Sequence, residues 1–209
     1  RDVYLQTGTA RCAVPKRVSV LGDVAYETIM RSLWQLWSSA LTPEQVDNII
    51  TAGEAQPPIG ATVFSGSDVD REVRSSTVRW LGEQWVRDLL WHYVKQANIN
   101  AFGVDVMNYA EMQFTEYHGT ENGHYNWHHD IHWNANVNSD RKLSITVQLS
   151  DPDDYEGGTF EFDECQTPAD AKAKGTILVF PSYLRHRVLP VTDGTRKSLV
   201  AWFHGPRWR

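Results

Sequence analysis

Residues 175–203 decide the fold, and they read GTILVFPSYLRHRVLPVTDGTRKSLVAWF. The stretch holds three β-rich runs, GTILVFP, RHRVLPV and RKSLVAWF, which turn residues separate. Upstream, KLSITVQLS (142–150) and GGTFEF (157–162) repeat the pattern, and residues 104–117 alternate between apolar and polar side chains. Many short strands at close spacing are typical of a sandwich or a jelly roll and not of alternating βαβ units. We therefore expect one all-β core that begins near Gly103.

The chain before this core is expected to supply helices. The tetrapeptide TPEQ, residues 42–45, combines a threonine cap, a proline at the first helical position and a glutamine that closes a capping box. It predicts a short helix through about Ala52. Residues 82–98, GEQWVRDLLWHYVKQAN, repeat apolar side chains at helical spacing and predict a second helix. Residues 24–40 are compatible with a strand or a helix.

Length and composition indicate one globular domain. The chain has 209 residues, of which 41% are hydrophobic and 22% charged. We expect a single domain over 1–209, in which 1–102 form an N-terminal segment with helical support and 103–209 form the core. No apolar run is long enough to cross a bilayer, and no signal pattern opens the chain. The first residue is Arg1, so we expect that residues upstream, including a targeting segment, can be missing.

Charge and cysteine content restrict the partners and the compartment. The formal net charge is −6, which weighs against binding to duplex nucleic acid. Cys12 and Cys165 have neither a zinc-type nor a redox spacing, and two cysteines do not make a disulfide framework. We therefore expect a cytoplasmic protein with no nucleic-acid and no membrane partner.

A cluster of histidines suggests a metal site. Residues 127–133 read WHHDIHW, and in an extended strand His128 and Asp130 lie on one face while His129 lies on the other. A His-x-Asp pair offers two of the three ligands of a 2-His-1-carboxylate site. Two histidines follow downstream, of which His204 is nearly terminal and His186 lies on a strand that a jelly roll can bring against the first.

Other polar residues suggest a site for a dicarboxylate. The run RKS places Arg196 and Ser198 on one face of a strand, and a guanidinium can bind a carboxylate through two parallel hydrogen bonds. Tyr117 and Tyr125 precede the His-x-Asp pair, and either could donate its hydroxyl to the same carboxylate.

From about Asp105 to Gly205 the chain resembles the Fe(II)/2-oxoglutarate-dependent dioxygenases, in particular the prolyl 4-hydroxylase-like branch with its bacterial and viral members of PKHD type. The resemblance rests on an ordered series of motifs, YNWHHD, VQLSDPDDYEGGTFEF, GTILVFP and HRVLPVTDGTRKSLVAW. It implies a double-stranded β-helix, or jelly roll, as the core. The fold class is then mainly β with N-terminal helices.

The resemblance also implies roles for single residues. It implies that His128, Asp130 and His186 are the iron ligands. Arg196 corresponds to the basic residue that pairs with the distal carboxylate of 2-oxoglutarate, although collagen-type prolyl hydroxylases usually have lysine there. We expect Tyr117 and Ser198 to help bind the co-substrate. We expect the substrate cleft to be bordered by Trp202, Arg141, His132 and Tyr125.

The activity that the resemblance implies is hydroxylation of an unactivated C–H bond, with Fe(II), 2-oxoglutarate and O2, release of succinate and CO2, and L-ascorbate as a reductant. An intact Asp130 favours hydroxylation over halogenation. The expected substrate is a prolyl residue of a peptide or protein, since aromatic side chains suit the flat ring. Three alternatives remain open. The first is a hydroxylase of a free amino acid or other small molecule. The second is a cupin-like metal-binding jelly roll without this chemistry, which Arg196 disfavours, and the third is a nucleic-acid demethylase, which the net charge disfavours. Oligomeric state is not predicted.

Overall fold

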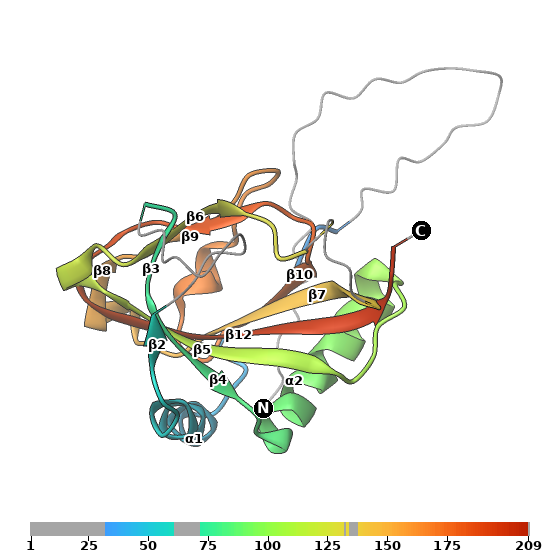
Figure 1. Cartoon of the computed structure of the whole chain (residues 1–209), viewed down its shortest axis with the longest axis horizontal. Helices are drawn as coiled ribbons and strands as arrows, with labels where there is room; N and C mark the ends of the chain where they lie inside the picture. The colour runs from blue at the N-terminus through green and yellow to red at the C-terminus, as the bar shows by residue number, and fades with distance from the viewer. Residues whose placement is uncertain (1–31, 61–71, 132, 134–137, 209) are drawn as a thin grey trace, which may run out of the picture.

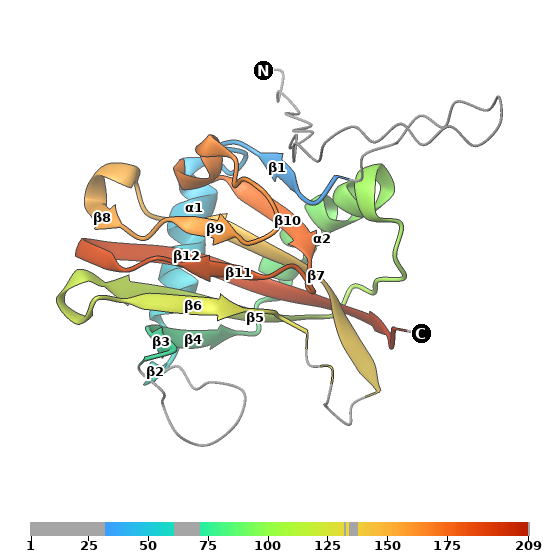
Figure 2. The same cartoon turned by 90° about the horizontal axis from the view of Figure 1, so that it is seen from above.

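The protein is described by a computed structural model that covers residues 32–60, 72–131, 133 and 138–208. In these residues two antiparallel sheets face each other, and two α-helices cover the outer face of the larger sheet (Figure 1; Figure 2). The helices are α1 (Pro43–Glu54) and α2 (Gln84–Ala97). Short helical turns are η1 (Asn98–Phe102, a π-helical turn), η2 (Gly119–Glu121), η3 (Pro152–Asp154) and η4 (Ala169–Lys172).

Within the described residues the larger sheet has eight strands in the order β1-β10-β7-β12-β5-β4-β2, with β8 paired to β12. The smaller sheet has the order β3-β6-β11-β9. The predicted mainly β fold with a jelly-roll core and N-terminal helices is confirmed. The strands are β1 (Gln35–Trp37), β2 (Ile59–Gly60), β3 (Arg74–Ser75), β4 (Thr77–Leu81), β5 (Ala110–His118), β6 (His124–His128), β7 (Ser139–Gln148), β8 (Tyr155–Gly157), β9 (Phe160–Phe162), β10 (Ile177–Pro181), β11 (His186–Val188) and β12 (Val191–Pro206).

The larger sheet has an apolar face and a polar face, which follow from the alternation in its central strands. In β7, Leu143, Ile145 and Val147 are fully buried in the hydrophobic core that contains α1 and α2. Between them, Ser144 and Thr146 point to the opposite face, toward the smaller sheet. Because β5 and β12 alternate in the same way, polar side chains such as Gln113 and Ser198 reach the space between the sheets, beside a second apolar cluster that both sheets form.

The predicted capping box at the start of α1 is present. The Thr42 hydroxyl accepts the backbone N–H of Gln45, and the Gln45 side chain accepts the N–H of Thr42. Near the other end of α1, Gly53 lies so close to the larger sheet that an added Cβ would be 2.5 Å from the ring of Phe114. Neither α-helix in the described part of the chain is long and apolar enough to span a membrane.

The layout before Gly103 differs from the expectation of helical support. Besides the two helices, this part contributes β1, β2 and β4 to the larger sheet and β3 to the smaller one. The first core strand is also shorter than predicted, because β5 begins at Ala110 instead of 104. Gly103 has a left-handed φ of 62°, and the Asn98 side chain binds both the N–H and the carbonyl of Val104. These hydrogen bonds take the place of the backbone–backbone hydrogen bonds that Val104 would make in a β-strand.

Candidate active site

A cavity lies between the two sheets and opens to solvent. One wall belongs to the larger sheet, with residues of β5, β7 and β12, and the other belongs mainly to the smaller sheet, with residues of β3, β6 and β11. The cavity is therefore the place where side chains from both halves of the jelly roll can meet one ligand.

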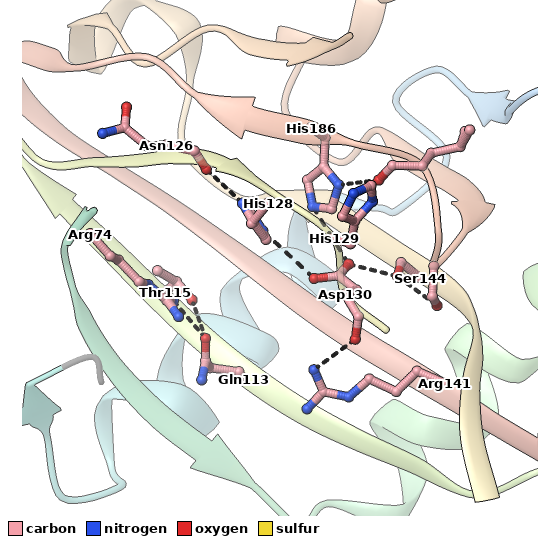
Figure 3. A network of polar contacts seen from close by, with 12 residues as sticks. Arg74, Gln113, Thr115, Asn126, His128, His129, Asp130, Arg141, Ser144 and His186 are labelled. Atoms are coloured by element: carbon pink, nitrogen blue, oxygen red, sulfur yellow. Dashed lines mark hydrogen bonds and ion pairs between the residues drawn. The ribbon is translucent and has the colours of Figure 1, made fainter. Parts of the chain in front are cut away.

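Three residues in this cavity form a cluster with the geometry of a metal site. His128 ends β6, Asp130 follows two residues later, and His186 begins β11. The two imidazoles point toward the carboxylate, with His128 Nε2 3.7 Å from Asp130 Oδ1 and His186 Nε2 3.5 Å from Oδ2 (Figure 3). The three potential ligand atoms lie within 4.8 Å of one another. The structure thus brings together the three residues that the sequence proposed as ligands.

Hydrogen bonds orient both imidazoles for coordination through Nε2. His128 Nδ1 lies 2.8 Å from the carbonyl of Asn126, and His186 Nδ1 lies 2.9 Å from the carbonyl of Leu184. A neutral imidazole that donates from Nδ1 to a carbonyl keeps the Nε2 lone pair for a metal ion. The donor set of two imidazoles and one carboxylate fits Fe(II).

A β-bulge and aromatic neighbours fix the position of His128. In the β6–β11 ladder, His186 pairs with His128 and Val188 with Tyr125, so the four residues 125–128 of β6 oppose the three residues 186–188 of β11. The extra residue allows both Tyr125 and His128 to face the cavity, although strict alternation would separate them. Their rings stack with centroids 3.5 Å apart. On the other side of the site, Phe180 packs against His186.

The environment keeps His128 and Asp130 in the protonation states that bind a metal. Burial, with a further effect from His186, lowers the pKa of His128 to about 3, so the imidazole is neutral. Burial alone would raise the pKa of Asp130, but the two histidines and the Ser144 hydroxyl outweigh it and the pKa is lowered. Ser144 Oγ donates to Asp130 Oδ2 over 2.7 Å and also contacts Ser182. Asp130 is therefore an oriented carboxylate with one lone pair already engaged.

The other histidines of the cluster lie elsewhere. His129 is exposed, and its Nδ1 lies 2.7 Å from the carbonyl of Tyr183, outside the group of three. His118 contacts Thr195, and His124 contacts backbone carbonyls. His132, which the sequence placed at the substrate cleft, lies outside the described residues.

Arg196 lines the same cavity and has no acidic partner among the described residues. The residue is 4% exposed, and its guanidinium lies 5.5 Å from the ring of Tyr117, its neighbour on β5. In the described part of the chain, no hydrogen bond or ion pair joins the Arg196 side chain to another residue. Ser198 lines the same cavity, whereas Lys197 points to the helices and binds Glu54 of α1. A buried guanidinium without a counter-ion is expected to bind an anionic ligand.

The second glycine of GGTF makes room for this arginine. Gly158 has a left-handed φ of 59°, and a Cβ added there would lie 2.9 Å from Arg196 Cδ. A side chain at this position would therefore displace the guanidinium, in addition to straining the backbone.

Trp202 and Arg141, both expected at the substrate cleft, lie together. The Arg141 guanidinium is 3.9 Å from the Trp202 ring, and it also binds Glu111. A hydrogen bond with His204 and the Arg141 charge, opposed by burial, lower the pKa of Glu111 to about 2. The Trp202 indole N–H is buried and has no acceptor among the described residues. Trp80, which is 45% exposed, lies 6.1 Å from Trp202 and extends the aromatic wall.

Sequence reasoning missed several residues of the cavity. Ser144 and Thr146 could have been found from the alternation of β7, which places every second side chain on the polar face. Gln113 follows the same rule in β5. Arg74 had no local signal, since β3 is only two residues long.

Comparison with known proteins agrees with this geometry. Residues 112–204 match the family model of the 2OG-Fe(II) oxygenase superfamily. A PKHD-type hydroxylase of Synechococcus sp. (strain CC9311) is 43% identical over 82 residues, which are 38% of this chain and 36% of the relative. The chain thus spans about a third of the length of the curated relatives that it matches.

Two solved structures have the same fold. The viral collagen prolyl hydroxylase of Paramecium Bursaria Chlorella virus-1, in complex with 2OG, has a TM-score of 0.60 at 18% identity and covers 83% of this chain and 97% of its own. A prolyl hydroxylase of Trichoplax adhaerens, in complex with a hypoxia inducible factor peptide fragment, has a TM-score of 0.63 at 16% identity and covers 83% and 84%. The resemblance inferred from the sequence is confirmed: the chain is similar to the prolyl 4-hydroxylase-like 2OG-Fe(II) oxygenases.

Proposed function

We propose that this chain is an Fe(II)- and 2-oxoglutarate-dependent dioxygenase that hydroxylates a prolyl residue in a peptide or protein. One observation carries the proposal. A 2-His-1-carboxylate cluster lines the same cavity as a buried arginine that has no acidic partner among the described residues. A metal-binding jelly roll without 2-oxoglutarate chemistry has no need for that arginine, which disfavours the cupin-like alternative.

In this proposal His128, Asp130 and His186 hold Fe(II). The chemistry that bound Fe(II) supplies is the oxidative decarboxylation of 2-oxoglutarate with O2, coupled to hydroxylation, which yields succinate and CO2. The chain contributes the geometry: hydrogen bonds from both Nδ1 atoms to backbone carbonyls fix the rings, and Ser144 orients the carboxylate. Such indirect contacts orient metal ligands in many sites.

Arg196 binds the distal carboxylate of 2-oxoglutarate through a charge-assisted pair of hydrogen bonds. Tyr117 and Ser198 line the cavity beside it and can add hydroxyl donors. Because the guanidinium is 4% exposed, water competes poorly for the carboxylate, and the contact is stronger than it would be at the surface.

The substrate binds where the aromatic wall meets the metal cluster. Trp202 supplies a flat apolar surface and a buried N–H without an acceptor, which a substrate carbonyl can satisfy. Arg141 stacks on this ring, and one of its nitrogens lies 3.4 Å from the backbone carbonyl of Asp130. Tyr125, whose pKa burial raises to about 12, keeps its hydroxyl protonated beside His128. A prolyl ring fits such a wall, and the peptide complex of the Trichoplax adhaerens protein supports a polypeptide substrate.

The second candidate substrate, which rests on the sequence analysis, is a free amino acid or another small molecule. L-ascorbate as a reductant and a cytoplasmic location complete the proposal, and both rest on the sequence analysis. The single-domain organisation over 1–209 is also part of it.

The test is a succinate-release assay with Fe(II), 2-oxoglutarate and O2. Proline-containing peptides, free amino acids and oligonucleotides are offered in turn, and the product is analysed for a gain of one oxygen atom in mass. We expect succinate above the substrate-free background and a heavier product with the peptides. Oxygen gain in a free amino acid or in a nucleotide, and none in the peptides, would refute the prolyl-polypeptide substrate.

A further inference from the structure

A second buried guanidinium, that of Arg74 in β3, lines the same cavity. Arg74 is 7% exposed. Its Nε donates to Ser76 Oγ over 2.9 Å. Its Nη2 donates to the side-chain carbonyl of Gln113 over 2.7 Å (Figure 3). The guanidinium lies 4.5 Å from the centroid of the Tyr125 ring. None of the sequence motifs assigns this residue a role.

The partners of Arg74 hold the side chain in place but do not neutralise it. A hydroxyl, an amide carbonyl and an aromatic ring are all uncharged, and Nη1 takes part in neither of the two hydrogen bonds. In the described part of the chain no carboxylate is bonded to Arg74. The Gln113 carbonyl is itself fixed, since the Thr115 hydroxyl also donates to it. The site is therefore rigid and positively charged.

In the proposed complex, no negative charge balances the positive charge of the Arg74 guanidinium. The charged residues among those that line it are Arg74, Arg196 and Asp130. In the proposed complex the charges of Fe(II) and 2-oxoglutarate cancel, and Arg196 pairs with the distal carboxylate of the co-substrate. One positive charge then remains, at Arg74. A buried charge is strongly destabilising unless it is paired, so a further anionic group is expected in the complex.

We infer that Arg74, held by Gln113, binds a carboxylate of the substrate itself. This inference rests on the proposed function and narrows its substrate class. Only the Tyr125 ring separates the Arg74 guanidinium from the ring of His128, because Tyr125 stacks on both. The carboxylate therefore belongs to the residue that is hydroxylated or to its direct neighbour. A C-terminal or free α-carboxylate and an acidic side chain next to proline share this chemistry.

The experiment compares ligands that differ only in this charge. N-acetyl-L-proline and its amide distinguish an α-carboxylate, and peptides with a Pro-Asp or a Pro-Asn pair distinguish an acidic neighbour. Binding to the full chain loaded with Mn(II) and 2-oxoglutarate is measured by calorimetry without O2, and turnover is measured with Fe(II) in air. We expect the wild-type protein to prefer at least one carboxylate ligand by about 10- to 100-fold, the range for a hydrogen bond to a charged group.

Three variants assign the preference. Arg74→Gln should lose it, with the change in KM rather than in kcat, while its Kd for 2-oxoglutarate stays near that of the wild type. Arg74→Lys should keep part of it, because the charge remains and the planar fork is lost. Arg87→Gln is the matched control, since this arginine lies on α2, outside the cavity, and the same charge is removed. This variant should keep the full preference.

Two outcomes would overturn the inference. One is equal affinity of the wild-type protein for both members of every pair, and the other is a preference that persists in Arg74→Gln. The proposed function can fail separately. Charge-selective binding through Arg74 without any hydroxylated product would refute the proposed prolyl hydroxylase activity and support the anion site. Hydroxylation of a peptide without charge selectivity would support the proposed activity and refute the anion site.

Discussion

Replacing Arg196 by methionine should change ligand affinity and stability in opposite directions. The substitution keeps an unbranched side chain of similar reach but removes the charge. Two charge-assisted hydrogen bonds to 2-oxoglutarate are lost, each worth about 1.5–3 kcal/mol. The smaller sum corresponds to a loss of affinity of about 100-fold. We therefore expect the Kd for 2-oxoglutarate to rise by about 100-fold or more.

The ligand-free protein should become more stable. Arg196 is 4% exposed and has no acidic partner among the described residues, so its charge is desolvated in the folded state without compensation. Replacement of buried charged groups by apolar ones is often neutral or stabilising by about 1–4 kcal/mol. A gain of about 1 kcal/mol would raise the Tm of a domain of this size by about 2–4 °C.

The assay is a calorimetric titration of 2-oxoglutarate into the Mn(II)-loaded protein without O2, together with thermal unfolding without co-substrate. Lys197→Met is the matched control, because Lys197 points to the helices and binds Glu54. It should keep the affinity for 2-oxoglutarate. The reasoning is refuted if Lys197→Met weakens binding as much as Arg196→Met does. A fall of several degrees in the Tm of ligand-free Arg196→Met would also refute it, since Arg196 would then be a structural residue.

Four further variants test the metal site and the core. His128→Ala should lose Mn(II) binding in a metal-content assay and His129→Ala should retain it, because only the first imidazole faces the carboxylate; the reverse result would mean that the strand register is wrong. Ser144→Ala should weaken Mn(II) binding by about 10- to 100-fold, since its hydroxyl orients Asp130, and unchanged affinity in a calorimetric titration would contradict this role. Gly53→Ala should lower the free energy of unfolding by about 1–3 kcal/mol in urea, because the new Cβ meets a phenylalanine ring at 2.5 Å, and an unchanged midpoint would show that the helix can shift freely.

The sequence could predict those helices and strands whose signal lies within one continuous run of residues. The capping box at Thr42 and the amphipathic run over 82–98 are local signals, and both helices form. The β-rich runs after residue 142 were visible for the same reason, because each alternates or is continuously apolar over several residues. The three clustered residues could be proposed because His128 and Asp130 are two apart and His186 is one of only two histidines downstream.

The remaining features depend on contacts between distant segments. Strands β2 and β3 have two residues each, which is too short for a period to appear, and they form because β4 and β6 offer them open edges. Arg74 enters the cavity through this pairing, so the local sequence cannot reveal it. The bulge that turns Tyr125 and His128 to the same side is a property of the β6–β11 ladder, and period-two reasoning within one strand does not detect it.

The cavity can hold polar side chains because the larger of the two apolar clusters lies on the other side of the larger sheet. Leu143, Ile145 and Val147 pack with α1 and α2, whereas Ser144 and Thr146, between them in the chain, face the smaller sheet. In each central strand, therefore, the residues that face the helices stabilise the fold, and the alternate residues that face the smaller sheet help to form the site. Substitutions on the two faces touch different partners and should combine nearly additively in unfolding experiments. This separation explains how one strand, β7, can stabilise the fold and also present a hydroxyl to Asp130.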